Sequence, residues 1–297
     1  MNRTTLPTAL LALVVLSGCG GAAENAATPS PSGSPTAAKD KKHQFEAAKA
    51  DCMKQKGFKY VPYVKPDRQL TEEQRQAESG DYQAMLKHRK KYGFEIFAQF
   101  VYPKEPGSPE AQAAAGSPNP NLAIREKLSD TQHTAYLKVM DSCMSAAGKQ
   151  VLGIEIKSVM DWYNQTFTAS KQTIKSELDS DPKLIELGGA MATCLKSKGY
   201  TVTNAAPTAL SVRGREEFMA LEDKLGREQR GDVPDKPTGG GEKEYARADL
   251  TPAQAKPHLA KETKSAVDDL ECGKDFYLAY LPRETAIRQR VHERYAM

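Results

Sequence analysis

The chain has 297 residues, of which 42 are Lys or Arg and 38 are Asp or Glu, giving a formal net charge of +4 at pH 7. A balance this close to neutral excludes the concentrated basic charge of a nucleic-acid-binding protein. Hydrophobic residues make up 39% of the chain and charged residues 27%, so a compact core with a well-solvated surface is expected. The length allows one large domain or two small ones.

The first residues of the chain have the features of a secretory signal peptide. Arg3 supplies a positive charge, residues 6–16 are almost all apolar, and Ser17 and Gly18 are small. The apolar run has about half of the ~20 residues that a helix needs to cross a bilayer, so a permanent transmembrane anchor is not expected. We predict that residues 1–18 are a signal peptide that is removed on export.

Leu16, Ser17, Gly18 and Cys19 resemble the lipobox of bacterial lipoproteins. That resemblance implies a diacylglycerol on the thiol of Cys19 and cleavage just before it. Two or more acyl chains on one residue give stable membrane attachment, because one chain alone is marginal. Membrane lipid would then be a partner of the chain, at the extracytoplasmic face of the cell membrane. The alternative is an ordinary secretory signal that is cut a few residues later.

Residues 19–42 are rich in Gly, Ala, Pro, Ser and Thr and show no apolar periodicity. We expect a disordered linker behind the lipidated cysteine. A flexible linker of this length spans roughly 25 Å, which is enough to lift a domain clear of the lipid headgroups.

The remaining chain contains two related copies of one pattern, which we assign to residues 43–160 and 161–297. A helical stripe of apolar residues leads to Cys52 in the first copy and to Cys194 in the second. Each cysteine is followed by a glycine and an aromatic residue, which favour a left-handed helix end with the aromatic ring folded back. These pairs are Gly57-Phe58 and Gly199-Tyr200.

Two further helices are predicted, one leading to Cys143 and one to Cys272. Each begins with a capping box, in which a Ser or Thr is followed by a Gln on the next helical turn. The two boxes are Ser129 with Gln132 and Thr251 with Gln254. Pro257 predicts a kink or a separate first turn in the second helix.

Besides Cys19 the chain has an even number of cysteines, which fits disulfide bonds in an oxidising compartment. Any of three pairings is open to Cys52, Cys143, Cys194 and Cys272. The repeat favours Cys52 with Cys143 and Cys194 with Cys272, each bond joining the two predicted helices of one copy. In the chain-entropy model each bond contributes up to about 4–5 kcal/mol.

These patterns predict a mainly α fold of two related, disulfide-linked helical units behind the linker, with short accessory strands near residues 58–64, 94–102 and 200–204. Two long stretches lack periodicity, residues 103–121 with five prolines and residues 231–249 with three consecutive glycines. Long loops of this kind are either functional or disordered, and the composition favours disorder.

Five features of the chain occur together: the lipobox, the Ala/Pro/Ser-rich linker, the segment from Cys52 to Pro62, Tyr92-Gly93-Phe94 and the capped helix leading to Cys143. In these features the chain resembles a group of uncharacterised actinobacterial surface lipoproteins. The resemblance covers most of residues 43–150 and, more weakly, the second half. The resemblance implies export and this kind of fold, and it carries no catalytic residues.

Local motifs for catalysis or metal binding are absent from the sequence, so we predict no catalytic residue, metal or cofactor. No G-x-S-x-G elbow occurs. Asp268 and Asp269 are neighbours on a predicted helix and point about 100° apart, so we interpret them as part of a solvated face. No H-E-x-x-H pattern or metal-ligand spacing relates the histidines, which are His43, His88, His133, His258 and His292.

The densest charge cluster is the basic run Lys-His-Arg-Lys-Lys at residues 87–91. A solvated helix face is the favoured interpretation, and contact with anionic lipid or wall polymer is the alternative. The aromatic-rich stretch that follows predicts core packing or, alternatively, a groove for a small ligand or peptide. Its members are Tyr92, Phe94, Phe97, Phe100 and Tyr102.

The expected function follows from the export signal and the missing catalytic motifs. We expect a membrane-anchored, non-catalytic binding or interaction module at the cell envelope, with an unknown envelope protein or small ligand as its partner and no nucleic acid. Two alternatives are a small-molecule or peptide binder that uses the aromatic stretch, and an envelope enzyme whose site is assembled only in space.

Overall fold

The computed structural model describes residues 35–66, 70–105, 119–231 and 244–297. The predicted signal peptide, the lipobox and Cys19 lie outside the described residues, as do most of the two long stretches that lack periodicity. Residues 35–297 belong to one compact unit.

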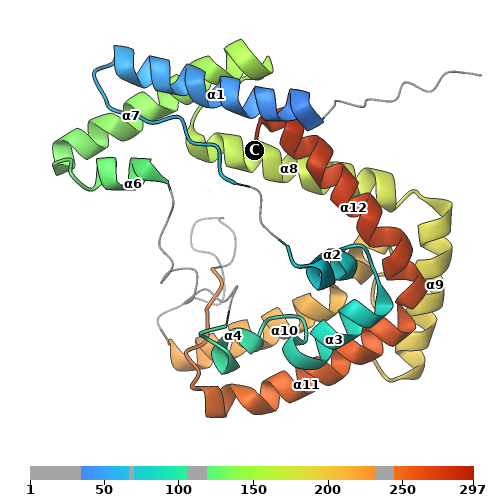
Figure 1. The fold of residues 1–297 in the computed structure, drawn as a ribbon. Coiled ribbons are helices and arrows are strands. Elements are labelled where there is room, and N and C mark those ends of the chain that lie inside the picture. Colours follow the sequence, from blue (N-terminus) through green and yellow to red (C-terminus); the bar gives the residue numbers. More distant parts are fainter. Residues whose placement is uncertain (1–34, 67–69, 106–118, 232–243) are drawn as a thin grey trace, which may run out of the picture. The chain divides into compact units, whose positions relative to one another are not determined.

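Helices form all the regular elements of the described residues, which confirms the mainly α prediction (Figure 1). The α-helices are α1 (Pro35–Gln55), α2 (Glu72–Glu78), α3 (Tyr82–Tyr92), α4 (Ala98–Val101), α6 (Pro120–Arg125), α7 (Asp130–Ala147), α8 (Val159–Leu178), α9 (Pro182–Ser197), α10 (Pro207–Gln229), α11 (Pro252–Cys272) and α12 (Lys274–Tyr295). A short π-helix, η1 (Gly148–Leu152), extends α7.

Helix α1 begins earlier than the sequence pattern predicted. The linker was expected to reach residue 42, but the helix starts at Pro35. Proline is favoured in the first turn of a helix because its missing N–H has no intrahelical acceptor there. The Ala and Lys residues that follow are good helix formers, so the end of the predicted linker belongs to the helix.

Both predicted disulfide pairings are confirmed. Cys52 in α1 bonds to Cys143 in α7, with their Cα atoms 5.5 Å apart. Cys194 in α9 bonds to Cys272 at the end of α11, again with a Cα separation of 5.5 Å. Helix α1 contacts α7, and α9 contacts α11 (Figure 1). Each disulfide therefore joins two helices that are already neighbours.

The predicted ends of α1 and α9 have the same backbone geometry. Gly57 has a φ of +83° and Gly199 has a φ of +88°, a conformation that side chains other than glycine rarely adopt. The N–H of Phe58 donates to the Met53 carbonyl at 2.9 Å, and the N–H of Tyr200 donates to the Leu195 carbonyl at 3.0 Å. These backward hydrogen bonds satisfy carbonyl groups that a helix end leaves without a partner.

The predicted capping boxes at Ser129 and Thr251 are also present, at the starts of α7 and α11. The separate first turn that Pro257 was expected to mark is absent, because Pro257 lies inside a continuous α11, while the kink stays a prediction. The missing N–H of Pro257 removes one hydrogen bond to Ala253, a residue that is exposed to water.

No strand occurs in the described residues, so the accessory strands predicted near residues 58–64, 94–102 and 200–204 are wrong. In the first segment the side chain of Asn121 takes the place of a neighbouring strand: its Oδ1 accepts from Val61 N and its Nδ2 donates to Val61 O, both at 2.8 Å. The second segment forms a turn and α4, and the third follows the end of α9 as an irregular connection.

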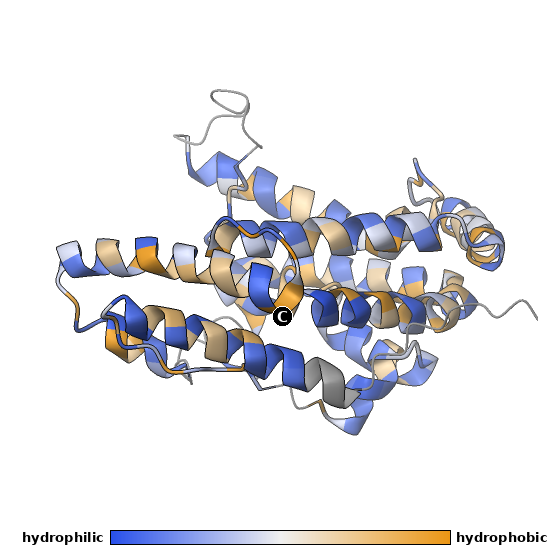
Figure 2. Ribbon diagram, turned by 90° about the horizontal axis from the view of Figure 1, so that it is seen from above, coloured by the Kyte–Doolittle hydropathy of each residue, from blue (hydrophilic) through white to orange (hydrophobic). Residues whose placement is uncertain are grey.

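Apolar and polar residues are interspersed along the helices (Figure 2), as expected for amphipathic helices around shared cores. Around the first disulfide, Met53 of α1 packs with Tyr136 and Met140 of α7. In another core, Phe45 of α1 and Trp162 of α8 pack with Val291 near the end of α12. Around the second disulfide, Met85 of α3 packs with Leu270 of α11. The sequence repeat therefore corresponds to two disulfide-linked helix pairs, while the helices around them are shared between the predicted halves.

We predict that replacing Cys194 and Cys272 together by Ala lowers the free energy of unfolding by about 2–5 kcal/mol, because the bond restricts the unfolded chain. Urea unfolding followed by circular dichroism measures the change. Cys19→Ala is the control, since Cys19 has no role in either disulfide, and equal stability of the disulfide variant and the control would contradict the prediction.

Candidate functional site

An open cleft with a volume of about 590 Å³ lies beside α2, α3 and α12. Apolar surface comes from Ala77, Met85 and Leu281. Charged side chains of both signs line it as well, among them Glu73, Lys87 and Glu95, together with the imidazole of His88. Such a combination of apolar contacts and a few polar groups is typical of a ligand site.

The turn between α2 and α3 fixes these two helices against α12. Gly80 has a φ of +87°, and a Cβ atom at this position would lie 2.6 Å from the carbonyl oxygen of Tyr277. Glycine is therefore required on both steric and conformational grounds. Helix α3 then starts at Asp81, whose side chain accepts a hydrogen bond from Ala84 N at 2.8 Å.

The basic run at residues 87–91 is largely neutralised by acidic partners. Lys87 pairs with Glu73 at 2.7 Å, and His88 Nε2 lies 3.1 Å from Glu95 Oε1. Lys91 pairs with Glu105 at 2.9 Å. The run therefore gives the cleft neighbouring positive and negative groups instead of a uniformly basic surface. The pairing disfavours the alternative interpretation of this run as a site for anionic polymer.

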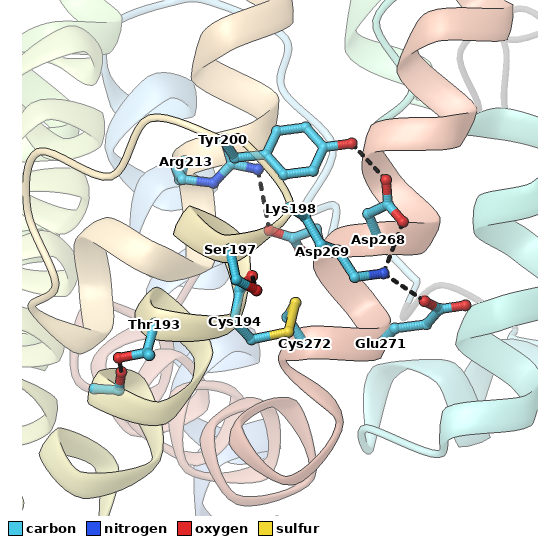
Figure 3. The surroundings of a disulfide bond; sticks show 11 residues. Thr193, Cys194, Ser197, Lys198, Tyr200, Arg213, Asp268, Asp269, Glu271 and Cys272 are labelled. Carbon is cyan, nitrogen blue, oxygen red and sulfur yellow. Dashed lines mark hydrogen bonds and ion pairs between the residues drawn. A yellow bond between two sulfur atoms is a disulfide. The ribbon is translucent and has the colours of Figure 1, made fainter.

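Arg89, in the middle of the basic run, points into the protein. Its Nη1 atom donates to Asp269 Oδ1 at 2.6 Å and to the carbonyl oxygen of Ala266 at 3.0 Å. The hydroxyl of Tyr277 donates to the same Asp269 oxygen at 2.6 Å. Burial and the neighbouring Asp269 carboxylate raise the pKa of Tyr277, so the hydroxyl keeps its proton and remains a donor. Arg213 approaches the other Asp269 oxygen at 3.4 Å (Figure 3).

The interpretation of Asp269 as part of a solvated face was wrong, since it is fully buried. Its partners Arg89 and Arg213 lie far from it in the sequence, so no local pattern identifies them. The sequence did contain one indication that Asp269 is buried. Glu262, Ala266 and Asp269 have the spacing of a single helix face, and all three are buried.

A second buried carboxylate, Glu262, holds the turn between α3 and α4. Its oxygens accept from the backbone N–H groups of Phe94 at 2.7 Å, Ile96 at 2.9 Å and Phe97 at 2.8 Å. Burial raises the pKa of Glu262, and the three N–H donors only partly oppose that rise. A Cβ atom at Gly93 would lie 2.7 Å from Glu262 Cγ, so the turn wraps closely around the carboxylate.

Glu95, at the centre of this turn, has a left-handed backbone with a φ of +69°. Such a conformation costs a residue other than glycine about 1–3 kcal/mol of free energy. The side chain of Glu95 lines the cleft and pairs with His88. The buried hydrogen bonds to Glu262 thus hold a strained acidic residue at the edge of the cleft, and sequence patterns gave no indication of it.

The aromatic stretch serves mainly as core. Phe97 is fully buried and packs edge-on against Phe218, and it stacks on His258 with ring centroids 4.9 Å apart. Of the five aromatic residues, Tyr92 lines the cleft. Core packing, the interpretation favoured from the sequence, therefore describes most of the stretch better than a ligand groove.

Around the disulfide between Cys194 and Cys272, an ionic cluster joins the end of α9 to α11 (Figure 3). Asp268 accepts from Lys198 at 2.9 Å, from Lys264 at 2.7 Å and from the Tyr200 hydroxyl at 2.6 Å. Partial burial alone would raise the pKa of Asp268, but these hydrogen bonds outweigh it and hold the pKa well below its ordinary value.

The histidines do not come together. His88 pairs with Glu95, His258 stacks on Phe97, and burial lowers the pKa of His292. Within the part of the chain that the structure describes, no group of three or more His, Cys, Asp or Glu side chains is placed to hold a metal ion.

Comparison of the chain with protein-family models, with curated proteins and with solved structures found no match. Among the described helices, none combines the length and apolar character required to span a bilayer.

We predict that Asp268→Asn lowers the free energy of unfolding at pH 7 by about 1–2 kcal/mol, because the charged hydrogen bonds are weakened. The folded-state pKa of Asp268 lies below its ordinary value of 3.8, so its contribution is present above that pH and is lost as the pH falls towards the folded-state pKa. Urea unfolding of both proteins at pH 7 and at pH values below about 4 should show the difference shrinking.

The control is Glu186→Gln, because Glu186 forms an exposed pair with Lys183 and should contribute little at any pH. A difference between the Asp268 variant and the parent that stays constant or grows towards low pH would contradict the assigned role of Asp268.

Proposed function

We propose that the chain is a lipid-anchored, non-catalytic binding module on the extracytoplasmic face of a cell membrane, and that the cleft beside α2 and α3 is its binding site. The lipobox residues Leu16 to Cys19 support the anchor. The two disulfides support an oxidising compartment, since such bonds rarely persist in the cytosol. The resemblance to actinobacterial surface lipoproteins agrees with both.

The observation that carries the proposed binding role is the strained Glu95 at the edge of the cleft. Strained residues persist only where surrounding structure holds them, and they gather at binding and catalytic sites. Here the structure that holds it is the set of hydrogen bonds from the turn to Glu262. This backbone conformation places a carboxylate next to His88, in a cleft that Met85 also lines.

The chemistry of the cleft favours a ligand with both signs of charge and a small apolar part, such as a short peptide segment of an envelope protein. The apolar part would contact Met85 and Leu281. Two exposed pairs lie at the cleft, Lys87 with Glu73 and His88 with Glu95. Charged groups of the ligand would replace one partner in each pair. Exposed ion pairs contribute only about 0–1 kcal/mol, so a ligand can displace them at little cost.

We predict that Glu95→Gly leaves the free energy of unfolding unchanged or raises it by up to about 1 kcal/mol, because glycine adopts the left-handed backbone without strain. The same variant should lose ligand capture. A photocrosslinking amino acid at Glu78, an exposed residue of the cleft lining, should give a defined adduct in intact cells in the parent and a weaker one in the Glu95→Gly background.

The matched control carries the crosslinker at Lys138, an exposed lysine on α7 away from the cleft lining. Identical adducts from the two positions, or no adduct from Glu78, would contradict a binding role for the cleft. A stable Glu95→Gly variant with unchanged capture would remove Glu95 from the site.

The anchor is tested separately by mass spectrometry of the chain isolated from membranes. We predict an N-terminal peptide that begins at Cys19 and carries acyl chains, and loss of those acyl chains in Cys19→Ser. A chain that begins a few residues later without lipid would instead establish an ordinary secretory signal.

A further inference from the structure

Helix α8 exposes three large apolar side chains on one face: Met160 is 67% exposed, Tyr163 is 51% exposed and Phe167 is 70% exposed. Residues three and four positions apart lie next to each other on a helix surface. We call these three residues the α8 stripe. A different set of α8 residues, including Trp162 and Ile174, is buried in the cores of the protein. The α8 stripe therefore lies outside the face of α8 that packs into the hydrophobic cores.

Lysines flank the stripe in the sequence. Lys157 comes three residues before Met160 and Lys171 comes four residues after Phe167, and both are exposed. The one acidic residue between them, Asp161, accepts hydrogen bonds from the Lys157 backbone and from the side chain of Gln165. Apolar side chains flanked by lysines are the pattern of helices that lie in a membrane interface, where the lysine ammonium groups reach the anionic headgroups.

The tether of the proposed lipid enters the folded unit near the stripe. Phe45 of α1 packs on Trp162 with ring centroids 5.9 Å apart, and Trp162 lies 4.9 Å from the Tyr163 ring. Helix α1 begins at Pro35, which is ten residues or about 15 Å of helix before Phe45. The chain between Cys19 and α1 can reach at most about 50 Å in any arrangement. A lipid on Cys19 would keep this part of the protein within reach of the bilayer.

We propose that the α8 stripe is a second membrane-attachment site, in which Phe167, Met160 and the ring of Tyr163 enter the interface of an anionic bilayer. This inference rests on the proposed lipid anchor for its biological setting. The lipid holds the chain at the surface but leaves the orientation of the folded unit free. Insertion of the stripe fixes that orientation, because one face of α8 must then lie parallel to the bilayer.

The experiment uses residues 19–297 carrying Cys19→Ser, so that no acyl chain contributes and failure of the lipidation proposal does not affect the result. Binding is measured by co-sedimentation with vesicles of phosphatidylcholine and phosphatidylglycerol. Met160→Ser with Phe167→Ser should weaken vesicle partitioning by about tenfold or more, since two apolar side chains no longer enter the interface. Leu278→Ser on α12, at a side chain that is 57% exposed, is the matched control and should partition like the parent.

Trp162 is the single tryptophan of the chain, so its fluorescence reports which part of the protein contacts the bilayer. Because it neighbours Tyr163, vesicles that contain brominated lipid should quench its fluorescence in the parent and much less in the stripe variant. Thermal unfolding of all variants checks that the exposed substitutions leave the fold intact.

Three results would overturn the inference. The parent could fail to bind these vesicles, the stripe variant could bind as well as the parent, or the Leu278 control could lose binding equally. A parent that forms dimers in solution without vesicles, and a stripe variant that is monomeric, would identify the stripe as an interface between copies instead.

Discussion

Two carboxylates buried in one helix, Glu262 and Asp269 of α11, constrain how the surrounding segments can pack. A buried carboxylate is costly unless donors surround it, so each position dictates which groups must lie beside it. Backbone N–H groups of the turn before α4 surround Glu262, whereas Arg89 of α3 and Tyr277 of α12 surround Asp269. Two of the helices beside the cleft, α3 and α12, are therefore held together through α11, and the neighbouring disulfide at Cys272 fixes the same helix to α9.

The charge pattern of the cleft follows from this arrangement. The basic run of α3 contributes Arg89 to the interior, while Lys87 and His88 remain at the cleft with acidic partners. The turn around Glu262 places Glu95 opposite His88 at the cost of backbone strain. A run that resembles a polybasic patch in the sequence thus becomes a surface of paired charges. Such a surface suits recognition of a mixed-charge ligand better than attraction of a uniformly anionic one.

Local patterns predicted a large share of the fold, because helix ends and caps depend on residues close in sequence. Gly57 and Gly199 marked two helix ends, and the duplicated pattern favoured the correct disulfide pairing. The candidate site was not predictable in the same way. Its main contacts join residues of the α3 region to α11, more than 160 positions away. The strand expected near residues 94–102 failed for this reason, since its N–H groups bind a distant carboxylate. The most useful signal would have been the polar residues within the buried stripe of α11.

Hydrogen exchange of Glu262→Ala, followed by mass spectrometry, tests this dependence on α11 most directly. Loss of the acceptor leaves the turn donors without a partner, so residues 93–97 and α3 should exchange much faster than in the parent protein. Protection of α1 and α7 should remain, because their disulfide and core do not involve Glu262. Unchanged protection of the turn, or equal loss of protection throughout the protein, would contradict the account.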